Sequence, residues 1–286
     1  MKKHMLPVIL LIVVVILLAG CGDGGSGAGE KEELRIVSLM PSNTEILFAL
    51  GLGDAVVGVT DYCNYPPELE KAVEEGRIQR MGDSYNVNEE LLVSLEPDLV
   101  LFGFASDAVE RLAGLGIRAE VIYPKSLEET YASIRLIGEL AGCQSEAEKL
   151  AADMEAAVAA VKEKAAAVPD AEKPRVLMLL DLDYLYVAGA GTLENELIAA
   201  AGGINVVEVQ DYPQINEEAI INYNPDIILC SFPFRDRILA EKEAWKGIAA
   251  VQNEAVYDVD GDLINRPGPR LVQGLEQLYA IFYPGQ

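Results

Sequence analysis

Two stretches of sixteen residues decide how this chain is organised: residues 89–104 read EELLVSLEPDLVLFGF and residues 217–232 read EEAIINYNPDIILCSF. They align without a gap at a constant offset of 128 positions, and an asparagine, Asn88 or Asn216, precedes each. An asparagine N-cap, two glutamates in the first turn, a short helix, Pro-Asp and a buried strand form one supersecondary unit. Because the unit is used twice, the sequence predicts two related lobes with a ligand cleft between them.

Apolar runs alternate with helical patterns around both stretches. We expect strands at residues 35–39, 56–59, 99–104, 119–123 and 175–180, and an amphipathic helix at 126–141. This alternation predicts α/β lobes with mainly parallel, Rossmann-like sheets. Residues 145–168 are rich in Ala, Glu and Lys and begin with the capping-box pattern Ser145-x-x-Glu148. A helix of this length spans roughly 36 Å at 1.5 Å per residue. It is either a long surface helix or a rigid connection between the lobes, and the second is favoured because the α/β pattern begins again at Arg175.

The first residues have the pattern of an export signal. A basic start is followed by a short apolar run, residues 6–18, which is too short for a bilayer span of about 20 residues. Residues 18–21 read LAGC and resemble the lipobox of bacterial lipoproteins, in which cleavage precedes a cysteine that receives the lipid, here Cys21. An ordinary signal peptide is the alternative. Residues 22–29 (GDGGSGAG) are typical of a flexible tether.

We therefore divide the chain into five parts and expect a lipid anchor on the extracytoplasmic side of the cell membrane, with no other membrane contact. The parts are a lipoprotein signal peptide (1–20), the lipidated Cys21 with its tether (21–32), an N-terminal lobe (33–143), a bridging helix (144–169) and a C-terminal lobe (170–286).

Charge and histidine content exclude several functions. The chain has 46 acidic and 22 basic residues, a net charge of −24, which disfavours nucleic acid as a partner. Cleavage after Gly20 removes two lysines and the only histidine, His4, which leaves 20 basic against 46 acidic residues, or −26. Nucleophile systems and metal sites that need imidazole cannot be built in such a chain. Three cysteines remain (Cys63, Cys143 and Cys230), so at most one disulfide forms among them, and three buried thiols are the alternative.

Three further motifs carry weaker signals. Residues 189–194 (GAGTLE) follow a strand and open a helix as a dinucleotide loop does, but Glu194 replaces the third glycine, which favours a plain strand-to-helix turn. Residues 258–262 alternate aspartates like a calcium loop, but Leu263 and Pro269 occupy positions that require Gly and Glu. Asp181 and Asp183 share one face of a predicted strand and are candidates for an acid/base pair.

Several ordered motifs resemble those of one family. They are residues 35–47 (RIVSLMPSNTEIL), 57–62 (VGVTDY), 65–67 (YPP), 97–100 (PDLV) and 266–272 (RPGPRLV). Together they resemble the substrate-binding proteins of cobalamin, ferric-siderophore and haem ABC importers, and the first lobe is most similar to the cobalamin branch. The resemblance implies a class III periplasmic-binding-protein fold with two lobes bridged by one long helix, little hinge motion, and delivery of cargo to a permease dimer powered by ATPase subunits.

The resemblance also assigns roles to individual residues. In the family one glutamate at the tip of each lobe docks onto permease arginines, and the motif positions fall on Glu90 and Glu218, with Glu89 and Glu217 adjacent. The resemblance also implies six ligand contacts in the cleft: Tyr62, Tyr85, Tyr186, Tyr212, Phe232 and Arg266. Of these, Tyr85, together with Ser84, occupies a region where relatives often carry Trp. Aromatic faces suit a large flat macrocycle, and a cleft arginine suits propionamide oxygens or an anionic chelate.

We thus expect a monomeric uptake protein that is not an enzyme, holds no cofactor or metal of its own, and captures cobalamin or a related corrinoid. Within the same family the alternatives are a ferric siderophore or haem, although a chain without mature histidine disfavours histidine-ligated haem. Two alternatives belong to other functional classes: a lipid-anchored hydrolase that uses carboxylates, and a surface adhesion or sensory module.

Overall fold

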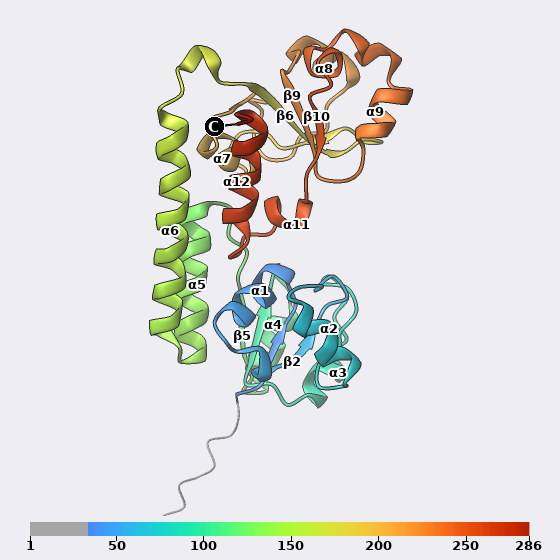
Figure 1. The fold of residues 1–286 in the computed structure, drawn as a ribbon. Helices are drawn as coiled ribbons and strands as arrows, with labels where there is room; N and C mark the ends of the chain where they lie inside the picture. The colour runs from blue at the N-terminus through green and yellow to red at the C-terminus, as the bar shows by residue number, and fades with distance from the viewer. Residues whose placement is uncertain (1–33, 286) are drawn as a thin grey trace, which may run out of the picture. The chain divides into compact units, whose positions relative to one another are not determined.

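A computed structural model describes residues 34–285 of this chain (Figure 1). The predicted signal peptide, the lipidation site at Cys21 and the tether lie outside the described residues. Among the residues described, no helix is both long enough and apolar enough to span a membrane.

The N-terminal sheet is entirely parallel, with the strand order β3-β2-β1-β4-β5. Its strands are β1 (Ile36–Ser38), β2 (Val56–Val59), β3 (Gln79–Arg80), β4 (Leu99–Phe102) and β5 (Arg118–Val121). The helices of this lobe are α1 (Pro41–Ala49), α2 (Pro67–Glu74), α3 (Glu89–Ser94) and α4 (Ala108–Gly114), with a 3₁₀ turn at Gly53–Ala55. Proline at the first position of α1 and of α2 suits a helix start, because the N–H that proline lacks has no partner within the helix there.

The C-terminal sheet has the order β10-β9-β6-β7, and β8 also pairs with β6. Its strands are β6 (Arg175–Asp181), β7 (Tyr186–Val187), β8 (Ile204–Asn205), β9 (Ile227–Cys230) and β10 (Val256–Asp258); of these pairings, the one between β6 and β7 is antiparallel. The helices are α7 (Leu193–Ala200), α8 (Glu217–Tyr223), α9 (Arg235–Glu241), α10 (Ala249–Gln252), α11 (Gly261–Ile264) and α12 (Leu271–Phe282), with 3₁₀ turns at Asp170–Glu172 and Glu243–Gly247.

The repeated sequence unit folds in the same way twice. The Asn88 side chain accepts a hydrogen bond from the Leu91 N–H at 3.0 Å, and the Asn216 side chain accepts one from the Ala219 N–H at 2.8 Å. In each copy the Pro-Asp carboxylate ties the following strand to the central strand. Asp98 accepts a bond from the Arg35 N–H at 2.8 Å, and Asp226 accepts one from the Arg175 N–H at 2.9 Å.

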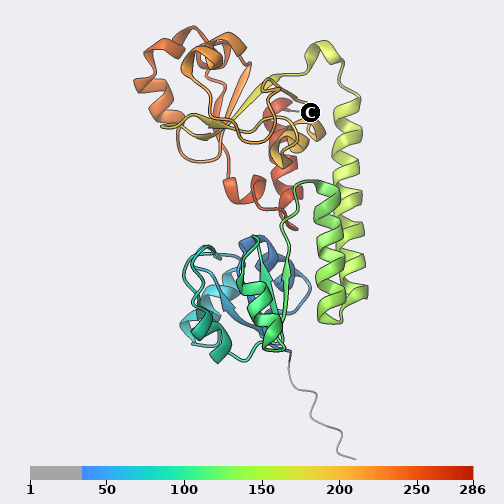
Figure 2. The same cartoon turned by 180° about the vertical axis from the view of Figure 1, so that it is seen from behind.

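A helical hairpin connects the lobes. Helices α5 (Leu127–Ala141) and α6 (Gln144–Ala166) run side by side (Figures 1 and 2). The predicted capping box is wrong: α6 begins after Cys143 without a side-chain cap, and Glu148 instead accepts a 2.7 Å bond from the Arg135 guanidinium of α5. The predicted fold class is confirmed, because the two mainly parallel sheets are bridged by one long helix, α6.

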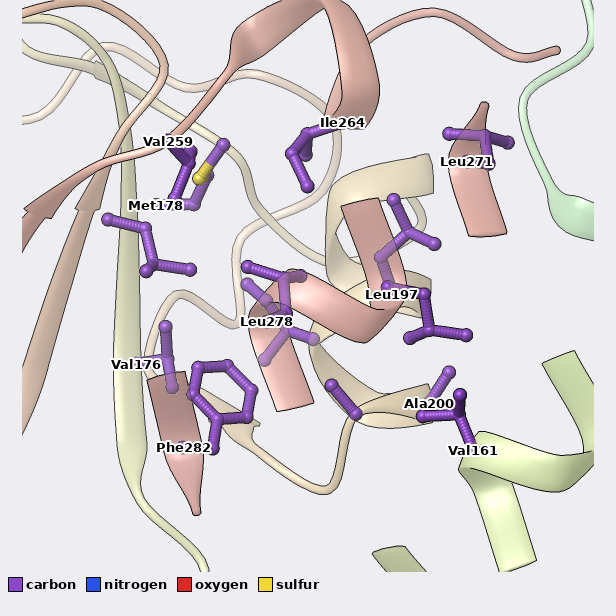
Figure 3. Packing of buried hydrophobic residues seen from close by; sticks show 14 of the residues in the cluster. Val161, Val176, Met178, Leu197, Ala200, Val259, Ile264, Leu271, Leu278 and Phe282 are labelled. Atoms are coloured by element: carbon purple, nitrogen blue, oxygen red, sulfur yellow. The ribbon is translucent and has the colours of Figure 1, made fainter. Parts of the chain in front are cut away.

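Helix α6 contributes to the cores of both lobes. Its first half places Ala151 and Met154 in the N-terminal core, and its second half places Val158 and Val161 in the C-terminal core. Figure 3 shows Val161 beside Leu197 and Ala200 of α7. Because the same helix is buried against both lobes, bending it between them would disturb two cores at once. Within the described residues, Cys63, Cys143 and Cys230 are all free thiols.

The contact between α5 and α6 generates a prediction. A Cβ added to Gly138 of α5 would lie 2.2 Å from the Ala147 Cβ of α6. We expect Gly138→Ala to lower the free energy of unfolding by about 1–3 kcal/mol, because overpacking forces the two helices apart. Urea titration followed by circular dichroism measures the change.

The matched control is Gly114→Ala at the end of α4, where an added Cβ meets nothing within 4 Å. It should leave stability unchanged or raise it slightly, because alanine favours helix more than glycine does. Equal effects of the two substitutions would contradict the close helix contact.

Candidate functional site

The strand order of each sheet points to a site at the carboxyl ends of its strands. In open α/β sheets ligands bind there, where the chain reverses its direction of travel across the sheet. This point lies between β1 and β4 in the first lobe and between β6 and β9 in the second. A cavity of about 590 Å³ lies at the ends of β9 and β10. It is lined by Ser231, Phe232, Pro233, Asp258, Val259, Asp260, Gly261, Asp262, Asn265 and Arg266.

A buried ion cluster joins the lobes beside this cavity. Glu45 of α1 is 4% exposed and accepts bonds from two arginines of the loop before α12. Arg266 donates to its Oε1 at 3.0 Å, and Arg270 donates to both carboxylate oxygens, at 2.8 and 2.6 Å. Arg270 also stacks on Tyr65, with 4.1 Å between the guanidinium carbon and the ring centre. Hydrogen bonding to Glu45 raises the pKa of Arg270, so the Arg270 guanidinium stays charged.

Arg266, predicted to contact ligand, is engaged mainly with protein groups. Besides Glu45 it donates to the Asn64 side chain at 2.7 Å and to the Tyr62 carbonyl at 3.3 Å, and it pairs with Asp262 at 2.8 Å. Its side chain is 14% exposed at the edge of the cavity. The structure therefore gives Arg266 a role in joining the lobes, and its role as a ligand contact remains a prediction.

An aromatic stack lines the end of the N-terminal sheet. Tyr85 lies parallel to Phe104, with 5.0 Å between the ring centres, and Phe104 lies 5.1 Å from Tyr123. Tyr85 was predicted from the family pattern, whereas Phe104 and Tyr123 were missed. Each is the last residue of a predicted strand (99–104 and 119–123), so their position at strand ends was a usable signal. Burial raises the pKa of Tyr123, so its hydroxyl stays protonated at neutral pH.

A second, smaller cavity of about 40 Å³ separates Tyr123 from the C-terminal lobe. Tyr123 and Lys125 line it from one side, and Glu194, Asp211 and Tyr212 line it from the other. The predicted ligand residue Tyr212 donates a 3.1 Å hydrogen bond to the Glu194 carboxyl. Burial raises the pKa of Glu194 and is also the main cause that raises the pKa of Tyr212.

The other predicted aromatic contacts are dispersed. Phe232 is 56% exposed, lines the larger cavity and lies 5.8 Å from the Phe234 ring. Tyr62 is exposed, and its backbone carbonyl lies at the Arg266 cluster. Tyr186 lies on β7 opposite Asp181 and forms an isolated bridge with Gln214, two residues after Tyr212.

The paired glutamates of the two repeats have different surroundings. Glu89 accepts a 3.0 Å bond from Arg111, and Glu217 accepts a 2.6 Å bond from Lys242. Arg111 holds the pKa of Glu89 below its usual range. Glu90 and Glu218 are more exposed, and among the ion pairs within residues 34–285 neither takes part in one. In each lobe, therefore, the second glutamate is the one available to an outside cation.

The weaker motifs have local structural roles. Thr192 caps α7 within the Gly189 to Glu194 turn, where a Cβ on Gly189 would lie 1.9 Å from the Val209 carbonyl oxygen. This close approach explains the glycine without a dinucleotide.

The aspartates have partners of their own. Asp258 accepts bonds from two backbone N–H groups and Asp260 caps α11. Asp181 accepts from the backbone and Asp183 pairs with Arg237 at 2.7 Å, so these two carboxylates are not arranged as an acid/base pair. In the part of the chain that is described, no group of three or more His, Cys, Asp or Glu side chains is placed to hold a metal ion.

Known proteins resemble this chain over most of its length. A family model described as "Periplasmic binding protein" matches residues 36–263. An uncharacterized ABC transporter substrate-binding lipoprotein of Bacillus subtilis is 38% identical over 263 residues, which cover 89% of this chain and 82% of that protein. A vitamin B12-binding protein of Vibrio cholerae is 28% identical over 254 residues, or 85% of this chain and 87% of that protein. The structure of a periplasmic haem-binding protein from Roseiflexus has a TM-score of 0.77 and 30% identity, covering 88% of this chain and 98% of that one.

The buried ion cluster should contribute strongly to stability. Glu45→Ala leaves Arg266 and Arg270 without their buried partner, so we expect it to cost about 3–5 kcal/mol in the free energy of unfolding. Asp153→Ala, which removes the exposed Lys149–Asp153 pair, is the control and should cost at most about 1 kcal/mol. Urea unfolding curves of the two variants measure these losses. A loss of unfolding free energy in Glu45→Ala no larger than that in Asp153→Ala would contradict a stabilising role for the cluster.

Proposed function

Because this chain belongs to the periplasmic binding protein family, we propose that it is the extracytoplasmic binding protein of an ABC importer and that its cargo is cobalamin or a related corrinoid. The family is one of substrate-binding transport proteins, and the binding proteins of ABC importers work with a permease and an ATPase.

The observation that carries the cargo proposal is the set of exposed and half-buried aromatic side chains at strand ends and in adjoining loops of both lobes. The Tyr85–Phe104–Tyr123 stack belongs to one lobe, and Tyr212 and Phe232 belong to the other. Aromatic faces bind large flat rings through apolar contact and stacking. The relative named for vitamin B12 supports a corrinoid as that ring.

Haem or a ferric siderophore is the second candidate. The structural likeness to a haem-binding protein supports it, and exposed tyrosines offer oxygen ligands for iron. Residues 34–285 contain no histidine, so an imidazole-ligated haem is not proposed. A carboxylate-dependent hydrolase has less support, because Asp181 and Asp183 have separate partners.

The anchor proposal rests on the sequence. Cys21 follows Leu18-Ala19-Gly20 in a lipobox-like pattern, and the most identical of the relatives described above is named a lipoprotein. A lipid on Cys21 would hold the monomeric binding protein on the extracytoplasmic side of the cell membrane, near its permease.

The docking proposal rests on charge and exposure. Glu90 and Glu218 lie in the first turns of equivalent helices, α3 and α8, and both side chains are exposed. Asn caps hold these first turns rigidly, so the two carboxylates are presented in a fixed geometry. We assign Glu90 and Glu218 to contacts with basic residues of the permease dimer.

Calorimetric titration of the full chain in detergent with cyanocobalamin tests the cargo. We expect one site, and at least a tenfold loss of affinity, about 1.4 kcal/mol, in both Tyr212→Ala and Phe232→Ala. Tyr257→Ala, an exposed tyrosine on β10 that lines neither cavity, should leave affinity unchanged. Saturable binding of haemin or a ferric hydroxamate, with none of cyanocobalamin, would transfer the proposal to the second candidate.

Uptake by cells that lack their own binding protein tests docking. The double variant Glu90→Ala/Glu218→Ala should keep its affinity for cyanocobalamin but lose uptake of the labelled vitamin. The matched double variant Glu89→Ala/Glu217→Ala removes two internal ion pairs and should keep most uptake. Normal uptake by the first variant would refute the assignment.

A further inference from the structure

Glu194 is a buried carboxyl group to which the proposed function gives no role. It lies in the first turn of α7, is 4% exposed and borders the small cavity between the lobes. Its carboxyl accepts a hydrogen bond from the Tyr212 hydroxyl at 3.1 Å, and the Thr192 side chain and its own backbone N–H also bond to it. A buried carboxyl normally pairs with a cation, yet no ion pair of the described residues includes Glu194.

The charged groups around this carboxyl do not neutralise it. From the segment after β5, Tyr123 and Lys125 face the cavity, but Lys125 makes no ion pair with Glu194 in the described part of the chain. From the segment before α8, Asp211 and Tyr212 face it, and Asp211 adds a further negative charge. Arg266 is held by Glu45, Asn64 and Asp262.

Tyr212 links this carboxyl to the cleft. Its ring is 45% exposed while its hydroxyl is bonded inward to Glu194, so the bond fixes which way the ring faces. Any ligand that contacts Tyr212 and Tyr123 therefore lies close to a carboxyl that has no cation beside it. Inside a protein an unscreened charge acts strongly over several ångströms, because the effective dielectric constant is well below that of water.

We propose that Glu194 is a specificity-determining residue that positions Tyr212 and makes this wall of the cleft select ligand faces bearing neutral amides over faces bearing ionised carboxylates. The inference rests on the proposed function and deepens it. The acetamide and propionamide side chains of a corrin ring are uncharged, whereas the propionates of haem are anionic, so the residue favours a corrinoid over haem.

The pH dependence follows from the direction of the pKa shift. Burial raises the pKa of Glu194, so the group is neutral below that raised value and becomes charged only above it. A ligand carboxylate is already ionised above about pH 5. Discrimination against it should therefore be weak at low pH and increase as the pH rises through the pKa of Glu194.

The test compares cyanocobalamin with its isomeric monocarboxylates, each of which has one propionamide hydrolysed, by calorimetry of the full chain between pH 5 and 9. In the unmodified protein the affinity ratio of amide to carboxylate should increase at least tenfold over this range for the isomer that faces the site. In Glu194→Gln, whose amide oxygen still accepts from Tyr212, the ratio should stay flat while cyanocobalamin affinity is kept. Glu276→Gln, an exposed site on α12, should behave as the unmodified protein.

A second variant separates positioning from charge. Tyr212→Phe keeps the ring but loses the bond to Glu194, so cyanocobalamin affinity should fall while the pH-dependent ratio persists. An amide-to-carboxylate affinity ratio that does not change with pH in the unmodified protein, or that still changes with pH in Glu194→Gln, overturns the role of Glu194 but leaves the proposed cargo standing. Failure of the unmodified protein to bind any of these corrinoids overturns the proposed cargo and the inference together.

Discussion

The buried cluster of Glu45, Arg266 and Arg270 is the interaction on which the geometry of the site depends. Glu45 belongs to the first helix of one lobe, and both arginines precede the last helix of the other. Removing either side would leave uncompensated charge in a buried place, so the lobes resist separation at this point. The cavity at the ends of β9 and β10 shares Arg266 with the cluster, and its shape is therefore set by the same bonds.

Helix α6 provides the second constraint, because its two halves are buried in different lobes. A binding protein held at two such places changes its lobe orientation little, and its affinity then comes mainly from a preformed cleft. Rigidity also suits docking. Two glutamates on equivalent capped helices keep a constant separation only if the lobes that carry them do not rotate. In the proposed function, recognition by a permease and retention of cargo thus depend on the same two contacts between the lobes.

The local features of the fold were predictable from the sequence and the long-range ones were not. Asn88 and Asn216 act on helix residues three positions away, so their caps could be inferred from neighbouring residues. Arg266 and its partner Glu45 are separated by 221 positions in the sequence, and the resemblance gave Arg266 a ligand role without indicating this bond. The capping box at Ser145 failed because α6 begins one residue earlier, at Gln144, and Glu148 binds Arg135 of another helix. The strand-end positions of Phe104 and Tyr123 were visible in the sequence, whereas Glu194 became a candidate only once packing placed it beside the same small cavity as Tyr123.

A crystal structure of the protein with cyanocobalamin tests the central claim most directly, namely that a preformed cleft between rigidly joined lobes holds a flat, neutral macrocycle. The account predicts a corrin ring between the Tyr85–Phe104–Tyr123 stack and the side chains of Tyr212 and Phe232, with the bonds from Arg266 and Arg270 to Glu45 intact. A corrinoid bound elsewhere, or lobes rotated apart with these bonds broken, would contradict it.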